Sequence, residues 1–191
     1  MLEFFYDVGS PWTYLAFHKI EQVAAEAGAE LVWKPILVGG VFNAVNPAVY
    51  ESRANPVKPR AEYMGKDLAD WARSYGLAIS FPKLFPVNSV KAMRGCFVAE
   101  DRGCISAFSR AVFAAYWGDH RDIAQDDVLT DISAGVGDGE VDEVFVRVGW
   151  DGVGERHGVA FVRSCWRASV GIASGIQGNR FSSRSRRPRN R

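Results

Sequence analysis

The stretch FYDVGSPWTY places a serine where an apolar run meets the start of a helix. Ser10 follows Gly9 and precedes Pro11, an arrangement typical of a helix N-cap. A helix N-terminus concentrates unsatisfied N–H groups and partial positive charge, so it stabilises an anion placed there. A serine hydroxyl at this point can also donate a hydrogen bond to a thiolate that a ligand brings in. Ser10 is therefore a cap, a group that stabilises a thiolate, or both.

The chain's own cysteines do not supply redox chemistry at this position. In the thioredoxin architecture the same place holds a reactive cysteine, but residues 10–13 read Ser-Pro-Trp-Thr, which excludes dithiol exchange there. Cys96, Cys104 and Cys165 form no CxxC pair, and an odd count argues against a disulfide framework. This favours a reducing compartment, with Cys96 and Cys104 buried in helices. No histidine pair has metal-ligand spacing, so no metal site is expected.

A β-α-β unit is expected to position Ser10. Residues 2–8 read as a buried strand, residues 11–27 as an amphipathic helix that ends at Gly28, and residues 30–37 as a second strand. A connection of this length predicts parallel strands with a right-handed crossover. Trp12 and Tyr14 on the first helix are candidates for the wall of an aromatic pocket, although aromatic residues on such a helix more often join the core.

The rest of the chain reads as mainly helical. Residues 39–59 are rich in Asn and Pro and are expected to form loops, and residues 81–89 (FPKLFPVNS) form another loop. Helical spacing covers residues 60–75, 90–100, 105–117, 125–134 and 140–148. The sequence thus predicts an α/β protein in which a helical segment follows the β-α-β unit.

Several of these segments together resemble one family. FYDVGSPWTYLAF, KPILVGGVFNA, ANPVKPRAEYMGKDLADWARSYGL, FPVNSVKAMRG and YWGDHRDI occur in this order. Over about residues 2–150 the chain resembles the 2-hydroxychromene-2-carboxylate isomerases, bacterial relatives of kappa-class glutathione transferases. The resemblance implies a thioredoxin-like domain with a large all-helical insertion, a homodimer and glutathione as cofactor.

The resemblance also assigns candidate roles to particular residues. Ser10 occupies the position of the catalytic serine that holds the glutathione sulfur. Asn55 and Asn88 match positions that contact substrate or cofactor; the alternatives are a turn asparagine before Pro56 and a helix cap. Arg60 takes the slot of a basic residue in the family, and Arg60 or Lys58 suits a substrate carboxylate. An exposed, solvated charge is the alternative for both cations.

The implied function is a glutathione-dependent isomerisation in the breakdown of aromatic compounds. In such a reaction a 2-hydroxychromene-2-carboxylate-like substrate opens and yields the trans-benzylidenepyruvate isomer. Two alternatives stay open at this point. One is a kappa-type glutathione transferase or peroxidase, which would consume glutathione. The other is a non-catalytic thioredoxin-like binding protein.

The charge pattern changes sharply near the C-terminus. The chain has 191 residues and a formal net charge of +1, but all 22 acidic residues lie at or before Glu155. Residues 156–191 carry nine arginines and neither lysine nor acid. No proline lies between Pro86 and Pro188, so the family's cis-proline loop, which faces the serine, is absent. Our hypothesis is that a shifted reading frame replaced the native C-terminus at about residues 155–160; the rival is an arginine-rich arm that binds nucleic acid.

These boundaries give three expected regions. Residues 1–38 form the N-terminal β-α-β part of the thioredoxin-like domain, residues 39–150 the mainly helical insertion, and residues 151–191 the atypical basic tail. The N-terminus lacks the features of a signal peptide, and no segment is long and apolar enough for a membrane span. The expected location is cytoplasmic. The expected partners are a small aromatic substrate and a second copy of the chain, with no nucleic acid, unless the tail binds it, and no membrane.

Overall fold

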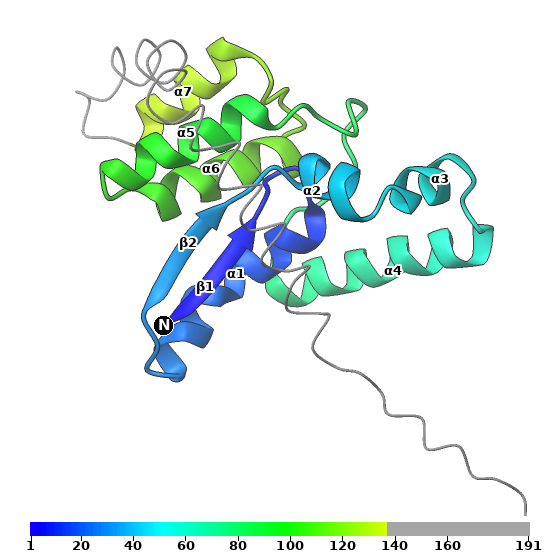
Figure 1. Cartoon of the computed structure of the whole chain (residues 1–191), viewed down its shortest axis with the longest axis horizontal. Coiled ribbons are helices and arrows are strands. Elements are labelled where there is room, and N and C mark those ends of the chain that lie inside the picture. The colour runs from blue at the N-terminus through cyan, green and yellow to red at the C-terminus, as the bar shows by residue number, and fades with distance from the viewer. Residues whose placement is uncertain (137–191) are drawn as a thin grey trace, which may run out of the picture.

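A computed structural model describes residues 1–136 of the chain (Figure 1). Two strands and seven helices follow one another in this part. They are β1 (Leu2–Tyr6), α1 (Pro11–Glu26), β2 (Leu31–Pro35), α2 (Val38–Val45), α3 (Ala48–Ala54), α4 (Lys58–Tyr75), α5 (Val90–Asp101), α6 (Ile105–Trp117) and α7 (Asp126–Val136). The helix expected over residues 140–148 and the basic tail lie outside the described residues.

The β-α-β unit forms as the sequence predicts. β1 and β2 pair in parallel, with Leu2 opposite Leu31 and Tyr6 opposite Pro35, and α1 connects them. Within the described residues the sheet contains these two strands. Both strands are shorter than expected. β1 ends at Tyr6, because Asp7 and Val8 lead into the turn before α1.

An aromatic core holds the β-α-β unit against the later helices. Phe17 of α1 is fully buried, and its ring lies 5.0 Å from that of Trp33 and 5.1 Å from that of Phe113, centroid to centroid. Tyr14 stacks on Phe113 at 4.8 Å, so it belongs to this core. Burying such side chains contributes on the order of 2 kcal/mol each. α6 is therefore attached to both α1 and the sheet.

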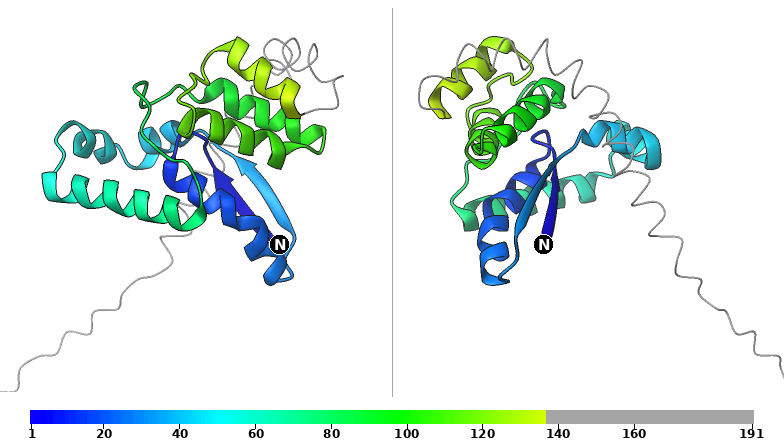
Figure 2. Two further views of the ribbon diagram at one scale, coloured as in Figure 1. Left: turned by 180° about the vertical axis from the view of Figure 1, so that it is seen from behind. Right: turned by 60° about the vertical axis from the view of Figure 1, so that its left-hand side comes forward.

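The helices form two groups. α5, α6 and α7 pack together, while α3 and α4 project away from the sheet on another side (Figure 1). The two other views show the same separation (Figure 2). α4 contacts α1 through a small cluster formed by Leu15, Leu68 and Ala72. The site described below lies where α2, α3 and α4 meet the N-terminus of α1.

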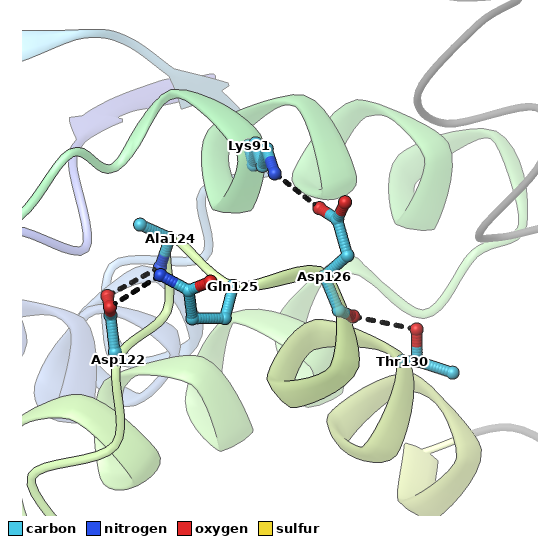
Figure 3. A network of polar contacts seen from close by, with 6 residues as sticks. All are labelled: Lys91, Asp122, Ala124, Gln125, Asp126 and Thr130. Atoms are coloured by element: carbon cyan, nitrogen blue, oxygen red, sulfur yellow. Dashed lines mark hydrogen bonds and ion pairs between the residues drawn. The ribbon is translucent and has the colours of Figure 1, made fainter.

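Polar contacts fasten the start of α7 (Figure 3). Asp122 accepts hydrogen bonds from the Ala124 N–H at 3.0 Å and from the side-chain amide of Gln125 at 2.8 Å. Lys91 of α5 forms an ion pair with Asp126 at 2.5 Å, and the Thr130 hydroxyl donates to the Asp126 carbonyl at 2.7 Å. α7 begins at Asp126, one residue after its expected start.

The expectation of loops over residues 39–59 is wrong, because α2 and α3 occupy most of this segment. Its helix-breaking residues lie at helix boundaries. Asn46 ends α2, Pro47 precedes α3 and Asn55 ends α3. α2 also receives a cap that local sequence cannot reveal, since the Val38 N–H donates to the Asp7 carboxylate at 2.8 Å. The next helix, α4, begins at Lys58 with Pro59 in its first turn, two residues earlier than expected.

The two described cysteines differ in environment. Cys96 is fully buried in α5, and this burial raises the pKa of its thiol to about 11. Cys104 is half-buried and caps the N-terminus of α6, so the expectation of a buried helical residue is wrong for it. No helix in the described part of the chain is both long and apolar enough to cross a membrane. Residues 1–136 likewise contain no group of three or more His, Cys, Asp or Glu placed to hold a metal ion.

Candidate active site at the N-terminus of α1

Ser10 is the N-cap of α1. Its backbone is extended, with φ −114° and ψ 121°, and its hydroxyl oxygen accepts the Thr13 N–H at 3.3 Å. Pro11 occupies the first helical position, where its missing N–H leaves no broken hydrogen bond. The cap bond uses a lone pair of the oxygen. The hydroxyl proton therefore remains available to donate to a ligand, in the field of the helix N-terminus.

A buried carboxylate holds the turn that carries Ser10. Asp7 is 2% exposed and accepts three hydrogen bonds. The donors are the Gly9 N–H at 2.8 Å, the Val38 N–H at 2.8 Å and the Ser89 hydroxyl at 3.2 Å. Burial raises the pKa of Asp7, and the three donors act in the opposite direction. One side chain thus joins the β1–α1 turn, the start of α2 and the start of α5.

Gly9 leaves room for this arrangement. A Cβ placed on Gly9 would lie 3.2 Å from a carboxylate oxygen of Asp7 and 3.8 Å from Ser89. The end of β1 is also tied to α6, because the Trp117 indole N–H donates to the Val8 carbonyl at 2.9 Å. Contacts with α2, with the start of α5 and with α6 therefore hold the residues just before Ser10.

A cavity of about 410 Å³ opens beside Ser10, a volume within the usual range of small-molecule sites. Its walls come from the β1–α1 turn, from α2, α3 and α4, and from the loop before α5. The lining residues are Gly9, Ser10, Pro11, Trp12, Val38, Phe42, Val49, Ser52, Arg53, Asn55, Pro56, Val57, Arg60, Ala61, Met64, Phe81 and Phe85. Most of this wall is apolar, and the charged residues that the described part of the chain contributes to it are Arg53 and Arg60.

Three of the five residues singled out in the sequence line this cavity together. They are Ser10, Asn55 and Arg60. They come from the start of α1, the end of α3 and the first turn of α4, so the fold brings together groups that are up to 50 positions apart. Trp12 also lines the cavity, whereas Tyr14 lies in the core.

The other two lie elsewhere. Lys58 is absent from the lining, and its ammonium group lies 3.9 Å from the carboxylate of Glu62 on an exposed face of α4. Asn88 lies at a second, more open hollow with Lys83 and Asp122. Its side-chain oxygen accepts the Val90 N–H at 3.2 Å, which is the capping alternative considered for this residue. Ser89, the N-cap residue of α5, donates its hydroxyl hydrogen bond to Asp7.

Sequence reasoning missed Asp7 and Arg53. An acid directly after a buried apolar strand is a signal for Asp7, because such a group requires donors from elsewhere in the chain. Arg53 was hidden by the interpretation of residues 39–59 as loop. Because Arg53 belongs to α3, the helix backbone fixes its position at the cavity wall.

Comparison with known proteins identifies the family. The model of the DSBA-like thioredoxin domain matches residues 1–152. The chain belongs to the DSBA-like thioredoxin domain family. Its α/β fold, with helices following the β-α-β unit, agrees with that family and with the fold expected from the sequence.

Similarity to individual curated proteins points to a more specific group. The chain is 27% identical over 119 residues to a 2-hydroxychromene-2-carboxylate isomerase of Pseudomonas putida, covering 62% of this chain and 57% of the relative. It is 29% identical over 119 residues to the enzyme of that name from Pseudomonas sp. strain C18, covering 62% of this chain and 54% of the relative. The matches thus span about half the length of these relatives.

Solved structures with the same fold include both an isomerase and an oxidoreductase. A 2-hydroxychromene-2-carboxylate isomerase superposes with a TM-score of 0.66 at 23% identity, over 88% of this chain and 78% of the other. A probable DsbA oxidoreductase of Streptomyces coelicolor gives a TM-score of 0.58 at 18% identity, over 93% and 75%. At these identities the structural similarity concerns the fold alone.

Proposed function

We propose that this protein is a glutathione-dependent isomerase of 2-hydroxychromene-2-carboxylate-like compounds formed during the breakdown of aromatic substances. The observation that carries the proposal is Ser10 itself. It is a serine hydroxyl at a helix N-terminus, with its proton free to donate, at the wall of a largely apolar cavity. The isomerase relatives support the choice of reaction.

The residues around the cavity suit glutathione. The Ser10 hydroxyl and the N-terminus of α1 favour a thiolate over a thiol, and each unit by which they lower the thiol pKa corresponds to about 1.4 kcal/mol. Arg53 and Arg60 supply positive charge for ligands that carry carboxylates. When bound, glutathione would supply the nucleophile that this chain's own residues do not provide at Ser10.

The protein's part in the reaction is to bind, orient and stabilise charge. Ser10 holds its proton on Oγ and donates it as a hydrogen bond towards the sulfur, without transferring it. Trp12 and Phe42 contribute apolar wall beside Ser10, which limits the access of water and strengthens electrostatic interactions in the site. Asn55 and Arg60 are positioned to hold the oxygen atoms of the substrate.

The test is turnover by the purified protein. A 2-hydroxychromene-2-carboxylate solution should lose its chromene absorbance and gain that of the ring-opened trans isomer only when glutathione is added. The total thiol should stay constant, because isomerisation consumes none. Loss of thiol in step with product would indicate a transferase, and binding of glutathione without turnover would indicate a non-catalytic binding protein. Either result would contradict the proposal.

We also propose that the protein forms a homodimer through α4. Tyr63 is 67% exposed and Trp71 is 47% exposed on this helix, and large aromatic residues are enriched in protein interfaces. Light scattering coupled to gel filtration should give twice the chain mass for the wild type. The double variant Tyr63→Glu, Trp71→Glu should elute as a monomer with an unchanged circular dichroism spectrum. A monomeric wild type would contradict the proposal.

A further inference from the structure

The cavity beside Ser10 carries positive charge that residues 1–136 do not neutralise. Arg53 and Arg60 line it, and among the described residues no Asp or Glu does. Neither guanidinium forms an ion pair with a carboxylate of this part of the chain. Both arginines are exposed, and cations without a carboxylate partner at the edge of a largely apolar hollow favour an anionic ligand.

Arg53 differs from Arg60 in its surroundings. The guanidinium carbon of Arg53 lies 5.5 Å from the ring centroid of Phe42 and 5.9 Å from that of Phe85, within the range of cation–π contacts. Phe85 is itself fixed, because its ring packs edge-on with Phe81 at 5.2 Å and lies 5.9 Å from the ring of Trp117. Arg53 is therefore held beside two aromatic rings that also line the cavity.

These contacts define a site for a particular kind of ligand. The rings of Phe42 and Phe85 offer flat apolar surface, and the planar guanidinium of Arg53 offers two parallel donors that match a carboxylate. Contact with the two rings also restricts the guanidinium, which lowers the entropy lost when it binds. An aromatic ring that bears a carboxylate can use all three groups at once.

We propose that Arg53 binds the carboxylate of the aromatic substrate and makes the site selective for aromatic carboxylates over neutral aromatic compounds. This inference rests on the proposed function for the identity of the substrate, but not for the selectivity itself. It assigns to Arg53 the role that the sequence suggested for Arg60 or Lys58. Arg60 is left to contact other ligand oxygens, and Lys58 lies outside the cavity.

The experiment compares two stable bicyclic probes by calorimetry on the full chain, coumarin-3-carboxylate and its neutral amide. The wild type should bind the carboxylate more tightly by roughly tenfold or more. Arg53→Met should abolish this preference while leaving amide binding nearly unchanged. Arg73→Met is the matched control, because Arg73 pairs with Asp70 on α4 and does not line the cavity; it should keep the wild-type preference.

Two further variants separate charge from geometry and one cation from the other. Arg53→Lys should keep part of the preference, since it retains the charge but loses the planar donors. Arg60→Met should keep most of it. The inference is overturned if the wild type shows no preference, if Arg53→Met retains it, or if Arg60→Met alone removes it. Because the probes require neither glutathione nor turnover, an inactive protein that shows Arg53-dependent selectivity contradicts the proposed function and still supports this inference.

Discussion

At the scale of single residues, the site depends on one hydroxyl and one buried carboxylate. The Ser10 oxygen caps α1, and under the proposed function its hydroxyl proton is the donor to the ligand's sulfur. Asp7 does not line the cavity, but it fixes the turn before Ser10 and the start of α2. Because Ser10 lines the cavity and Asp7 does not, substitutions at the two residues test ligand binding and stability separately.

Replacing Ser10 with alanine should remove the chemistry and leave the fold. The lost cap should lower the free energy of unfolding by about 1 kcal/mol. Glutathione-dependent turnover should fall by a factor of roughly tens or more, because the thiolate loses a charge-assisted hydrogen bond. Steady-state kinetics and thermal denaturation measure the two effects separately. Ser52→Ala, at another hydroxyl of the cavity wall, is the control. Full activity in Ser10→Ala would show that the serine is only a cap.

Asp7 should make stability depend on pH. Burial raises its pKa in the folded protein above the ordinary value of 3.8, so the folded state binds its proton more tightly than the unfolded state does. The free energy of unfolding should therefore fall as pH rises from about 3.8 through the folded-state pKa, and level off above it. Urea unfolding at a series of pH values measures this slope.

The variant Asp7→Asn isolates this contribution. It should lose about 1 kcal/mol, because its amide can accept from only one of the two backbone N–H groups that Asp7 satisfies. Above pH 3.8 its unfolding free energy should depend less on pH than that of the wild type, because it lacks the carboxyl group whose pKa is raised on folding. Glu100 also has a raised pKa and remains in both proteins, so the difference between them reports Asp7. Equal slopes would contradict this account.

At the scale of elements, the sequence predicted those helices and strands whose boundaries are set by residues close to them in the chain. α1 was found from the Ser-Pro start and the Gly28 stop, and the parallel pairing of β1 and β2 from the length of their connection. α2 escaped prediction because its cap is Asp7, 31 positions earlier. The interpretation of residues 39–59 as loop also hid α3, and with it Arg53. Ser10 was singled out by its position before the first helix and then by the family resemblance, and Asn55 and Arg60 by the resemblance alone. Only the three-dimensional structure places Lys58 and Asn88 away from the cavity.

The turn before α7 allows a comparison between a carboxylate that closes a turn and a surface ion pair. Asp122 accepts two hydrogen bonds from residues 124 and 125, whereas Arg121 pairs with Asp131 at 2.7 Å on the surface. Asp122→Ala should lower the unfolding free energy by about 1 kcal/mol, and Arg121→Met by about 0.5 kcal/mol or less. Denaturant titration of both variants gives the order. A larger loss in Arg121→Met would contradict it.

At the scale of the whole molecule, the break in charge lies close to the end of the family match. The DSBA-like domain matches up to residue 152, and the arginine-rich composition begins at Arg156. We retain the proposal that a shifted reading frame produced residues 156–191. Resequencing the gene tests the proposal directly. Glutathione binding tests its consequence, which is a weakened cofactor site.

The chain with residues 156–191 in place should respond weakly to glutathione. In the described residues the sheet has only β1 and β2, and a two-stranded sheet gains stability when further strands pair with its edges. The resemblance to the isomerases also implies a C-terminal cis-proline loop that faces Ser10, and no proline lies between Pro86 and Pro188. A version in which the C-terminal segment of an isomerase relative replaces residues 156–191 should therefore be more soluble. Millimolar glutathione should raise its melting temperature by roughly 2–4 °C for each kcal/mol of binding, and should raise that of the present chain less. Equal shifts in both proteins would mean that residues 156–191 take part in a working fold and that the frameshift proposal is wrong.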